Sequence, residues 1–259
     1  RGPGISRVTT TTLNSAPSTE TDGAGPPIAE ITPSLRAETF IVIAAYNEAG
    51  VIGGVTAELA KAFPNVIVVD DGSSDETAEQ ARPHSAFVLR HMVNRGQGAA
   101  LQTGIEFAVQ RGAQYVITFD ADGQHRVDDI PRLLEPLVSG RAEIALGSRF
   151  LGEATDMRLS RRIVLRMAVL FTRWVNRVRL TDAHNGLRAF SRRAAVRINI
   201  TADRMAHASE LIDIIKTMEL PYQEVPVRIR YTEYSRRKGQ SVRSSWRILV
   251  HYFMGRLFG

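Results

Sequence analysis

The chain has 259 residues, of which 44% are hydrophobic, so it can bury one sizeable core as a single domain with an extension. It contains no cysteine, which excludes a disulfide framework, a thiolate zinc site and a cysteine nucleophile. The net charge of +6 is uneven, because residues 1–140 carry 10 Lys and Arg against 17 Asp and Glu, whereas residues 141–259 carry 23 against 10. The basic half therefore requires an anionic partner, whether phosphate, acidic lipid or nucleic acid.

No apolar run approaches the roughly 20 residues of a membrane span, and no cleavable signal pattern opens the chain. Residues 1–38 are rich in Thr, Ser, Pro and Gly and show little apolar periodicity, so we expect a flexible N-terminal extension. The absence of cysteine and of a signal pattern agrees with a protein of the reducing cytoplasm.

From Thr39 onward, apolar strand segments alternate with segments of helical spacing. The expected strands are 39–45, 66–69, 86–89, 115–119 and 143–147. The expected helices are 51–63, 75–81 with Ser74 at or near its N-cap, 97–111 and 127–138. This alternation predicts an α/β fold with a mostly parallel, doubly wound sheet.

The alternation ends after Arg149, and a helix over 206–218 and a strand over 222–231 are the next regular elements expected. Residues 158–179 combine an apolar stripe with seven arginines, and the C-terminal residues 242–259 repeat the mixture of basic and aromatic side chains. Basic amphipathic helices with aromatic residues are typical of segments that lie on anionic bilayers. We therefore expect C-terminal basic amphipathic helices that dock peripherally on the inner face of the membrane or on a membrane partner protein; ordinary packing or self-association is the alternative.

Polar clusters follow four of the expected strands, at residues 46–48, 70–72, 120–124 and 148–149. In parallel α/β sheets, ligands bind at the carboxyl ends of the strands. Four clusters on one edge predict a binding site more strongly than any of them does alone.

The sequence Asp-Ala-Asp-Gly-Gln at 120–124 is the most specific of these clusters. Alternate residues of a strand exit share a face, so Asp120, Asp122 and Gln124 can converge on one point. Their oxygen atoms suit Mg²⁺ or Mn²⁺ rather than zinc, and such ions usually bind through one or two carboxylates plus substrate phosphates. The implied substrate carries a diphosphate, although a solvated Asp-Gly turn would use the same residue types.

Taken together, these clusters resemble the inverting family-2 glycosyltransferases of GT-A fold, in the branch of the dolichyl-phosphate mannose synthases. The resemblance covers residues 39–241, which we take as the glycosyltransferase domain between the extension (1–38) and the C-terminal basic helix (242–259). Its matching segments are 45–48, 69–73, 94–104, 120–125, 147–149, 182–188 and 238–241. One departure is Ala44, where such proteins commonly have proline, which alters loop stiffness rather than chemistry.

The resemblance implies roles for individual residues. It places the nucleotide against Ala44, Ala45, Tyr46, Glu48, Val69, Asp71 and Asp120, with Asp71 or Glu48 accepting hydrogen bonds from base or ribose. It places the metal among Asp120, Asp122 and Gln124. A lipid phosphate would be held by Ser148, Arg149, Arg161, Arg162, Arg188 and Lys238, since arginine's planar fork suits phosphate oxygens.

The resemblance thus implies a metal-dependent, inverting transfer of a hexose from GDP-mannose or UDP-glucose, or a similar donor, to a polyprenyl or dolichyl phosphate. Asp122, Arg149 and Asp182 are its expected catalytic residues. A lipid phosphate is already anionic, whereas a saccharide hydroxyl would need a general base, for which Asp182 or Glu210 is available. The Gln-x-x-Arg-Trp signature usual in polymer-extending relatives is absent, so the saccharide acceptor stands second.

Two other classes compete with this interpretation. The basic half could belong to a non-enzymatic nucleic-acid-binding protein, but the chain has no recognised reader motif, and no nucleic-acid partner is expected. A sugar nucleotidyltransferase would need a glycine-rich, arginine-containing opening loop, which is also absent.

Overall fold

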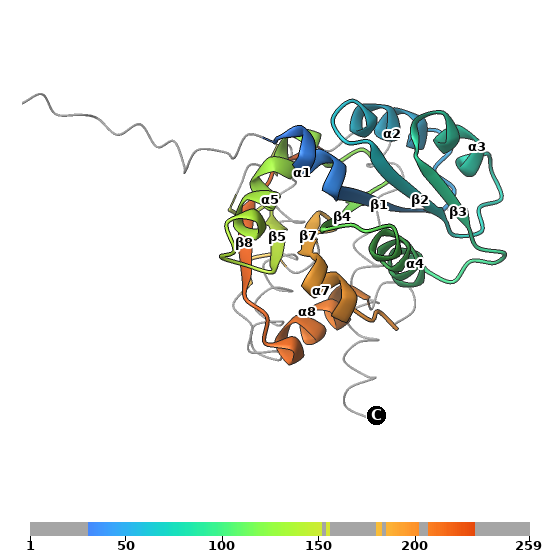
Figure 1. The fold of residues 1–259 in the computed structure, drawn as a ribbon. Coiled ribbons are helices and arrows are strands. Elements are labelled where there is room, and N and C mark those ends of the chain that lie inside the picture. The colour runs from blue at the N-terminus through green and yellow to red at the C-terminus, as the bar shows by residue number, and fades with distance from the viewer. Residues whose placement is uncertain (1–30, 152–153, 156–179, 183–184, 202–206, 231–259) are drawn as a thin grey trace, which may run out of the picture.

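A seven-stranded sheet with the order β3-β2-β1-β4-β7-β5-β8 forms the centre of the protein. The computed structural model describes residues 31–151, 154–155, 180–182, 185–201 and 207–230 (Figure 1). Only β7 among the described strands of this sheet runs antiparallel to its neighbours. The strands are β1 (Thr39–Ala45), β2 (Asn65–Asp70), β3 (Phe87–Arg90), β4 (Tyr115–Asp120), β5 (Ile144–Ser148), β7 (Arg188–Ser191) and β8 (Tyr222–Pro226). The predicted α/β fold with a mostly parallel, doubly wound sheet is confirmed.

Helices cover both faces of this sheet (Figure 1). One face packs against α2 (Ile52–Ala60), α3 (Thr77–Ala81) and α5 (Ile130–Val138). The other packs against α4 (Gln97–Gln110), α7 (Arg192–Arg197) and α8 (His207–Met218). Short 3-10 turns, Arg82–His84 and Val127–Asp129, precede β3 and α5. Two further short strands, β6 (Ala154–Thr155) and β9 (Ile229–Arg230), pair in parallel as a second sheet.

The sequence of β1 explains its central position. Ile41 and Ile43 enter the core on the α2 and α5 side, whereas Phe40 and Val42 enter the core on the α4 side. A strand that buries both faces reads as a continuous apolar run, as β1 does, because alternate side chains point to opposite faces. The covered sheet provides a rigid base for the polar loops that follow its strands.

The structure differs from the expected elements in several places. Among the described residues, the first helix is α1 (Pro33–Glu38), which lies inside the segment expected to be an extension. Helix α3 begins at Thr77 rather than Asp75, and Ser74 is not its N-cap, because the Ser74 amide donates to Asn47 Oδ1 at 3.0 Å. The expected strand 222–231 divides into β8 and β9, since β8 ends at Pro226, which has no amide hydrogen to continue the ladder.

Strand β7 and helix α7 are two of the described elements that the sequence did not predict. β7 has four residues and begins with a charged residue, Arg188, so its apolar pattern is too short to detect. The expected basic helices at 158–179 and 242–259 lie outside the described residues. In the part of the chain that the structure describes, no helix is both long and apolar enough to span a bilayer.

Candidate active site

The polar clusters meet along one edge of the sheet. Strands β1, β2, β4 and β5 all end at this edge, and the antiparallel β7 begins there. The strand register places Ala44 beside Asp120 and Ala45 beside Asp70. Arg188, at the start of β7, pairs with Thr118, two residues before Asp120. We call this edge the rim. After the two substrates that the sequence resemblance implies, we name its β1, β2 and β4 side the donor side and its β7, β5 and β8 side the acceptor side.

The exit of β4 carries the acidic cluster of the donor side. Asp122 Oδ1 accepts a hydrogen bond from the Gln124 amide at 3.0 Å, and its Oδ2 accepts from Gln124 Nε2 at 2.7 Å. His125 then turns back, and its Nε2 lies 2.9 Å from Asp120 Oδ2. The backbone bend occurs at Gly123, whose φ of 71° is the left-handed conformation that glycine adopts readily. The bend thus gathers Asp120, Asp122 and Gln124 in one tight turn.

Electrostatics within this turn favour a cation. The pKa of Asp122 is raised above its usual range by burial first and then by the negative charge of Asp120, with Glu48 acting in the same direction. Like charges at close range disfavour ionisation of a carboxyl group, and a positive ion nearby relieves this repulsion. The oxygen donors and the mutual repulsion of these carboxylates therefore fit a hard divalent cation.

The described residues contain no cluster of three or more His, Asp or Glu side chains that could hold a metal by themselves. Mg²⁺ commonly keeps several waters and takes only one or two carboxylates, with substrate phosphates completing its shell. Asp120 and Asp122, with the side-chain oxygen of Gln124, supply a donor set of this type.

The loops after β1 and β2 are bound to each other by hydrogen bonds. The Asn47 amide donates to Ser73 Oγ at 2.9 Å, and the Glu48 amide donates to Thr77 Oγ1 at 2.8 Å. Tyr46, at the tip of this region, is 45% exposed. Tyr46 is thus exposed on a loop that hydrogen bonds brace, and Glu48, in the same loop, is partly buried.

Two residues expected to contact the nucleotide have buried side chains. Val69 is 0% exposed and Ala45 is 2% exposed, because both lie in central strands that helices cover on each face. Ala44 is only partly buried and lies next to Asp120 in the strand register. Of the three small apolar residues expected there, Ala44 alone retains exposed surface.

Asp71 organises the loop that follows β3. It is 2% exposed, and its carboxylate accepts hydrogen bonds from the Arg95 amide at 2.9 Å and the Gly96 amide at 2.7 Å. His91 Nδ1 lies 2.7 Å from the same carboxylate, and its Nε2 lies 3.0 Å from Thr103 Oγ1. Asp71 was expected to accept hydrogen bonds from a base or ribose, and the structure gives it three protein partners.

On the acceptor side, Arg149 is fixed by Asp182. Asp182 Oδ2 accepts from the Arg149 backbone amide at 3.1 Å and from Arg149 Nε at 2.6 Å. Both side chains are buried, with exposed fractions of 9% for Arg149 and 1% for Asp182. A buried, charge-assisted hydrogen bond to Nε restricts the orientation of a guanidinium group. Asp182, which was expected to be a catalytic residue and an available general base, therefore anchors Arg149 in the structure.

Arg188 lies between the two sides of the rim. It is 4% exposed, and burial lowers its pKa, an effect that the charges of Asp120 and Asp182 oppose. Ser148 is also fully buried, and its hydroxyl lies 2.6 Å from Thr181 Oγ1. Both residues were expected to bind the acceptor phosphate. In the structure, Ser148 contacts Thr181, and Arg188 lies in β7 between β4 and β5. Arg161, Arg162 and Lys238 lie outside the described residues.

Gly186 brings the acceptor side against the donor side. A Cβ atom at this position would lie 2.2 Å from both carboxylate oxygens of Asp120. The Gly186 carbonyl also accepts a hydrogen bond from Thr118 Oγ1 at 2.7 Å. Only a residue without a side chain leaves room for Asp120 here, which the sequence alone does not reveal.

Three further side chains of the rim carry roles that sequence reasoning missed or left open. Glu224 on β8 accepts hydrogen bonds from Thr181 and Asp182. His125 pairs with Asp120. Glu210, the alternative general base, accepts from the Thr201 amide at 2.8 Å and from its hydroxyl at 2.6 Å. Each candidate base thus already accepts hydrogen bonds from the protein: Asp182 from Arg149, and Glu210 from Thr201.

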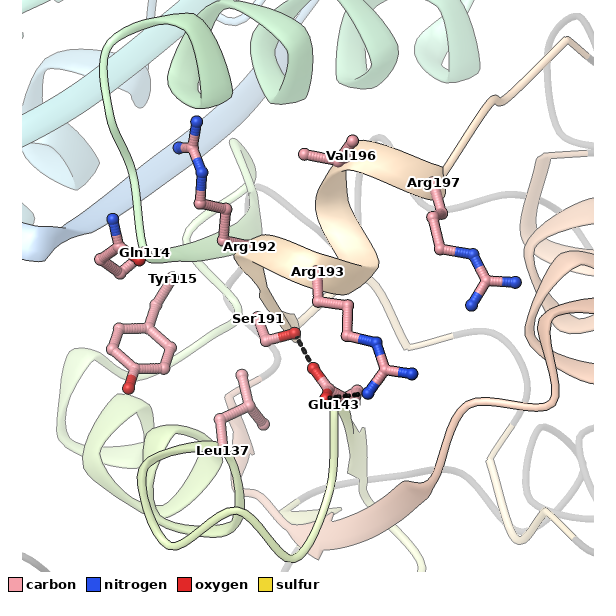
Figure 2. Close-up of a pocket in the computed structure, with 9 residues that line it drawn as sticks. All are labelled: Gln114, Tyr115, Leu137, Glu143, Ser191, Arg192, Arg193, Val196 and Arg197. Carbon is pink, nitrogen blue, oxygen red and sulfur yellow. Dashed lines mark hydrogen bonds and ion pairs between the residues drawn. The ribbon is translucent and has the colours of Figure 1, made fainter.

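A groove of about 650 Å³ lies at the opposite end of the sheet from the rim (Figure 2). It is bordered by Tyr115 at the start of β4 and by Glu143, just before β5. Glu143 accepts a hydrogen bond from Ser191 and pairs with Arg193 at 3.2 Å. Arg193 of the groove is therefore paired with a protein carboxylate. The groove is separate from the acidic cluster.

Comparison with known proteins agrees with this geometry. Residues 40–198 match the family described as glycosyl transferase family 2. The UDP-N-acetylglucosamine–dolichyl-phosphate N-acetylglucosaminyltransferase of Methanococcus voltae is 32% identical over 237 residues, which cover 83% of this chain and 94% of that protein. The polyprenol monophosphomannose synthase of Mycolicibacterium smegmatis is 28% identical over 246 residues, covering 89% and 92%. The chain belongs to glycosyl transferase family 2, and it is a glycosyltransferase.

The fold is also that of solved glycosyltransferases. Glucosyl-3-phosphoglycerate synthase from Mycobacterium tuberculosis, in a crystal structure with Mn²⁺ and UDP-glucose, aligns with a TM-score of 0.67 at 20% identity. The alignment covers 90% of this chain and 84% of that chain. The expected GT-A fold and enzyme class are confirmed, and the alternative of a non-enzymatic nucleic-acid-binding protein is wrong.

Proposed function

We propose that this enzyme transfers a hexose from a nucleotide diphosphate sugar to a polyprenyl phosphate, in a reaction that requires Mg²⁺ or Mn²⁺ and inverts the anomeric carbon. The observation that carries the proposal is the pairing on one rim of an acidic turn, Asp120 to Gln124, with an arginine, Arg149, that Asp182 fixes. One element fits a cation with a diphosphate, and the other fits a second, separate phosphate.

The relatives support the same pair of substrates. The Methanococcus voltae and Mycolicibacterium smegmatis relatives are named for dolichyl-phosphate and polyprenol acceptors, respectively, and the structural relative holds Mn²⁺ with UDP-glucose. The alignments with this chain cover 94% and 92% of these two relatives, respectively. An acceptor embedded in a bilayer also requires the enzyme to work at a membrane surface, so we propose peripheral docking there or on a membrane partner protein.

On the donor side, Asp120, Asp122 and Gln124 would hold the ion that accompanies the donor diphosphate. When bound, a divalent ion acts as a Lewis acid that neutralises the leaving diphosphate. His125 keeps Asp120 in place, and Tyr46 and Glu48 border the nucleoside on their braced loop.

On the acceptor side, Arg149 would position the lipid phosphate so that one of its oxygens attacks the anomeric carbon from the face opposite the nucleoside diphosphate. The new carbon–oxygen bond forms as the bond to the diphosphate breaks, and a single displacement inverts the configuration. A phosphate oxygen needs no proton removed near neutral pH, which agrees with the engagement of Asp182 and Glu210 elsewhere.

A panel of radiolabelled UDP- and GDP-hexoses, incubated with polyprenyl phosphate and Mn²⁺ and then extracted into organic solvent, tests this function. We expect one donor to transfer label into the organic phase, with loss of transfer in EDTA. An absence of lipid-linked label with every donor, or label that reaches only water-soluble saccharides, would contradict the proposal.

A further inference from the structure

Glu224 is a carboxylate on β8 that binds a segment 43 residues away in the sequence. Its oxygens accept hydrogen bonds from the Thr181 amide at 2.8 and 2.9 Å and from the Thr181 hydroxyl at 2.9 Å. They also accept from the Asp182 amide at 3.1 Å. One carboxylate thus satisfies two successive backbone amides and a hydroxyl, in the manner of an anion bound by a backbone turn.

The segment that Glu224 holds is the one that holds Arg149. Asp182, whose amide donates to Glu224, accepts from the Arg149 amide and from Arg149 Nε. Thr181, whose hydroxyl donates to Glu224, is in contact with the Ser148 hydroxyl at 2.6 Å. Three separate parts of the chain, at the ends of β5 and β8 and at residues 181–182, are therefore joined at one point.

Hydrogen bonds connect Glu224 to Asp182 and Asp182 to Arg149, so the position of Arg149 depends on Glu224. A carboxylate that accepts a charge-assisted hydrogen bond from Arg149 can orient it only if its own backbone is fixed. Glu224 fixes that backbone, because it binds the amide of Asp182 itself. Its effect on Arg149 is indirect, and it has no role in the chemical step.

We propose that Glu224 is a positioning residue that sets the orientation of Arg149 for binding of the acceptor phosphate. The part of this inference that concerns the acceptor rests on the proposed function, whereas the part that concerns the orientation of Arg149 does not. The substitution Glu224→Gln tests it, because glutamine keeps the size of the side chain but replaces one acceptor oxygen with a donor amide.

We expect Glu224→Gln to raise the KM for polyprenyl phosphate about tenfold or more, with kcat and the KM for the nucleotide sugar close to wild type. Glu224→Asp, which keeps the charge, should recover part of this loss. The matched control is Glu143→Gln, because Glu143 also accepts from a hydroxyl and pairs with an arginine, but at the groove away from the rim (Figure 2). The control should lower thermal stability without changing the KM for the acceptor.

Two measurements separate positioning from a general loss of stability. In a double-mutant cycle, Glu224→Gln should add little to the acceptor KM of Arg149→Ala, because both changes remove the same oriented guanidinium group. In NMR spectra, hydrogen exchange at Arg149 Nε–H should accelerate in Glu224→Gln, with the resonance assigned by its absence in Arg149→Lys.

The outcomes are distinct. A Glu224→Gln variant that loses only thermal stability, as the control does, and keeps wild-type acceptor KM and Nε–H exchange would overturn the inference. If the wild-type enzyme transfers nothing to polyprenyl phosphate while Glu224→Gln still accelerates exchange at Arg149, the orientation role stands and the proposed function fails.

Discussion

The two sides of the rim solve the problem of buried charge differently. On the donor side, Asp122 lies among other carboxylates, and the charges of Asp120 and Glu48 add to burial in raising its pKa. On the acceptor side, Asp182 is matched with Arg149 at 2.6 Å, and Glu224 accepts from backbone amides. Like charges on the donor side would be stabilised by the cation that we propose, whereas the carboxylate of Asp182 on the acceptor side is already paired with a protein group.

Under the proposed function, this difference corresponds to two phosphate sites of different kinds on the same fold. A nucleotide diphosphate binds together with a cation, so the protein supplies oxygen ligands. The negative charge of these ligands would be neutralised when the cation binds. A lipid monophosphate brings no cation, so the protein supplies an arginine and holds it in place before binding. Variants on the two sides should therefore fail in different ways.

The largest effect is expected from removing a carboxylate of the donor side. Asp122→Ala should lower the transfer rate about a thousandfold, because the charge of the leaving diphosphate loses its stabilisation. Initial rates with saturating donor and acceptor measure it. Asp128→Asn is the matched control, since Asp128 has an exposed side chain six residues along the chain and should retain wild-type activity. Full activity of Asp122→Ala would remove the donor site from this turn.

A methyl group at the junction between the two sides should have the next largest effect. Gly186→Ala places a Cβ atom against the Asp120 carboxylate and should lower kcat/KM about a hundredfold, because misplacement by about 1 Å has effects of this size. Mn²⁺ affinity in the presence of donor, measured by calorimetry, should weaken with it. Gly54→Ala in α2 is the control, because its Cβ meets no atom within 4 Å. Wild-type affinity in Gly186→Ala would show that Asp120 tolerates displacement.

Loss of the acceptor-side arginine should have a smaller and more selective effect. Arg149→Ala is expected to raise the KM for polyprenyl phosphate about 10- to 100-fold, which corresponds to one lost charge-assisted hydrogen-bond pair, while donor affinity is unchanged. Steady-state kinetics with each substrate varied in turn would show this. Arg193→Ala, at the groove on the opposite end of the sheet, serves as control. A donor-specific defect in Arg149→Ala would reverse the assignment of the two sides.

The smallest effect concerns stability without metal. The pKa of Asp122 is higher in the folded protein, so folding favours its neutral form. The contribution of Asp122 to the free energy of unfolding is therefore fully present below about pH 4 and is lost as the pH rises through the raised pKa. Asp122→Asn, which cannot ionise, should therefore be more stable than wild type in EDTA at neutral pH, and the two should converge at lower pH. Urea unfolding at several pH values measures the difference. A less stable Asp122→Asn at neutral pH would show that the ionised carboxylate is favourable in the folded protein without metal.

The donor side was the more predictable part of the molecule. Asp120, Asp122 and Gln124 are neighbours in sequence at the end of a clear apolar strand, so the local pattern is enough to place them on one turn. Likewise, the long apolar run of β1 identifies a central strand. Local signals of this kind also predicted the parallel sheet and the edge on which the polar loops meet.

The acceptor side depends on contacts that no local pattern reveals. Arg149 and Asp182 are 33 residues apart, and Thr181 and Glu224 are 43 apart. Asp182 was expected to be a catalytic residue or a base, and only its contact with Arg149 in the folded chain shows that it binds this arginine. The burial of Val69 and Ser148 was likewise set by layers that assemble from distant segments.

Calorimetry with Mn²⁺ and a nucleotide diphosphate, each titrated in the absence and presence of the other, tests the central claim most directly. If the acidic turn holds a cation shared with the diphosphate, each ligand should strengthen binding of the other by the same factor, about tenfold or more, and Asp122→Asn should remove this coupling. Independent binding of the two ligands, or coupling that persists in Asp122→Asn, would contradict the account.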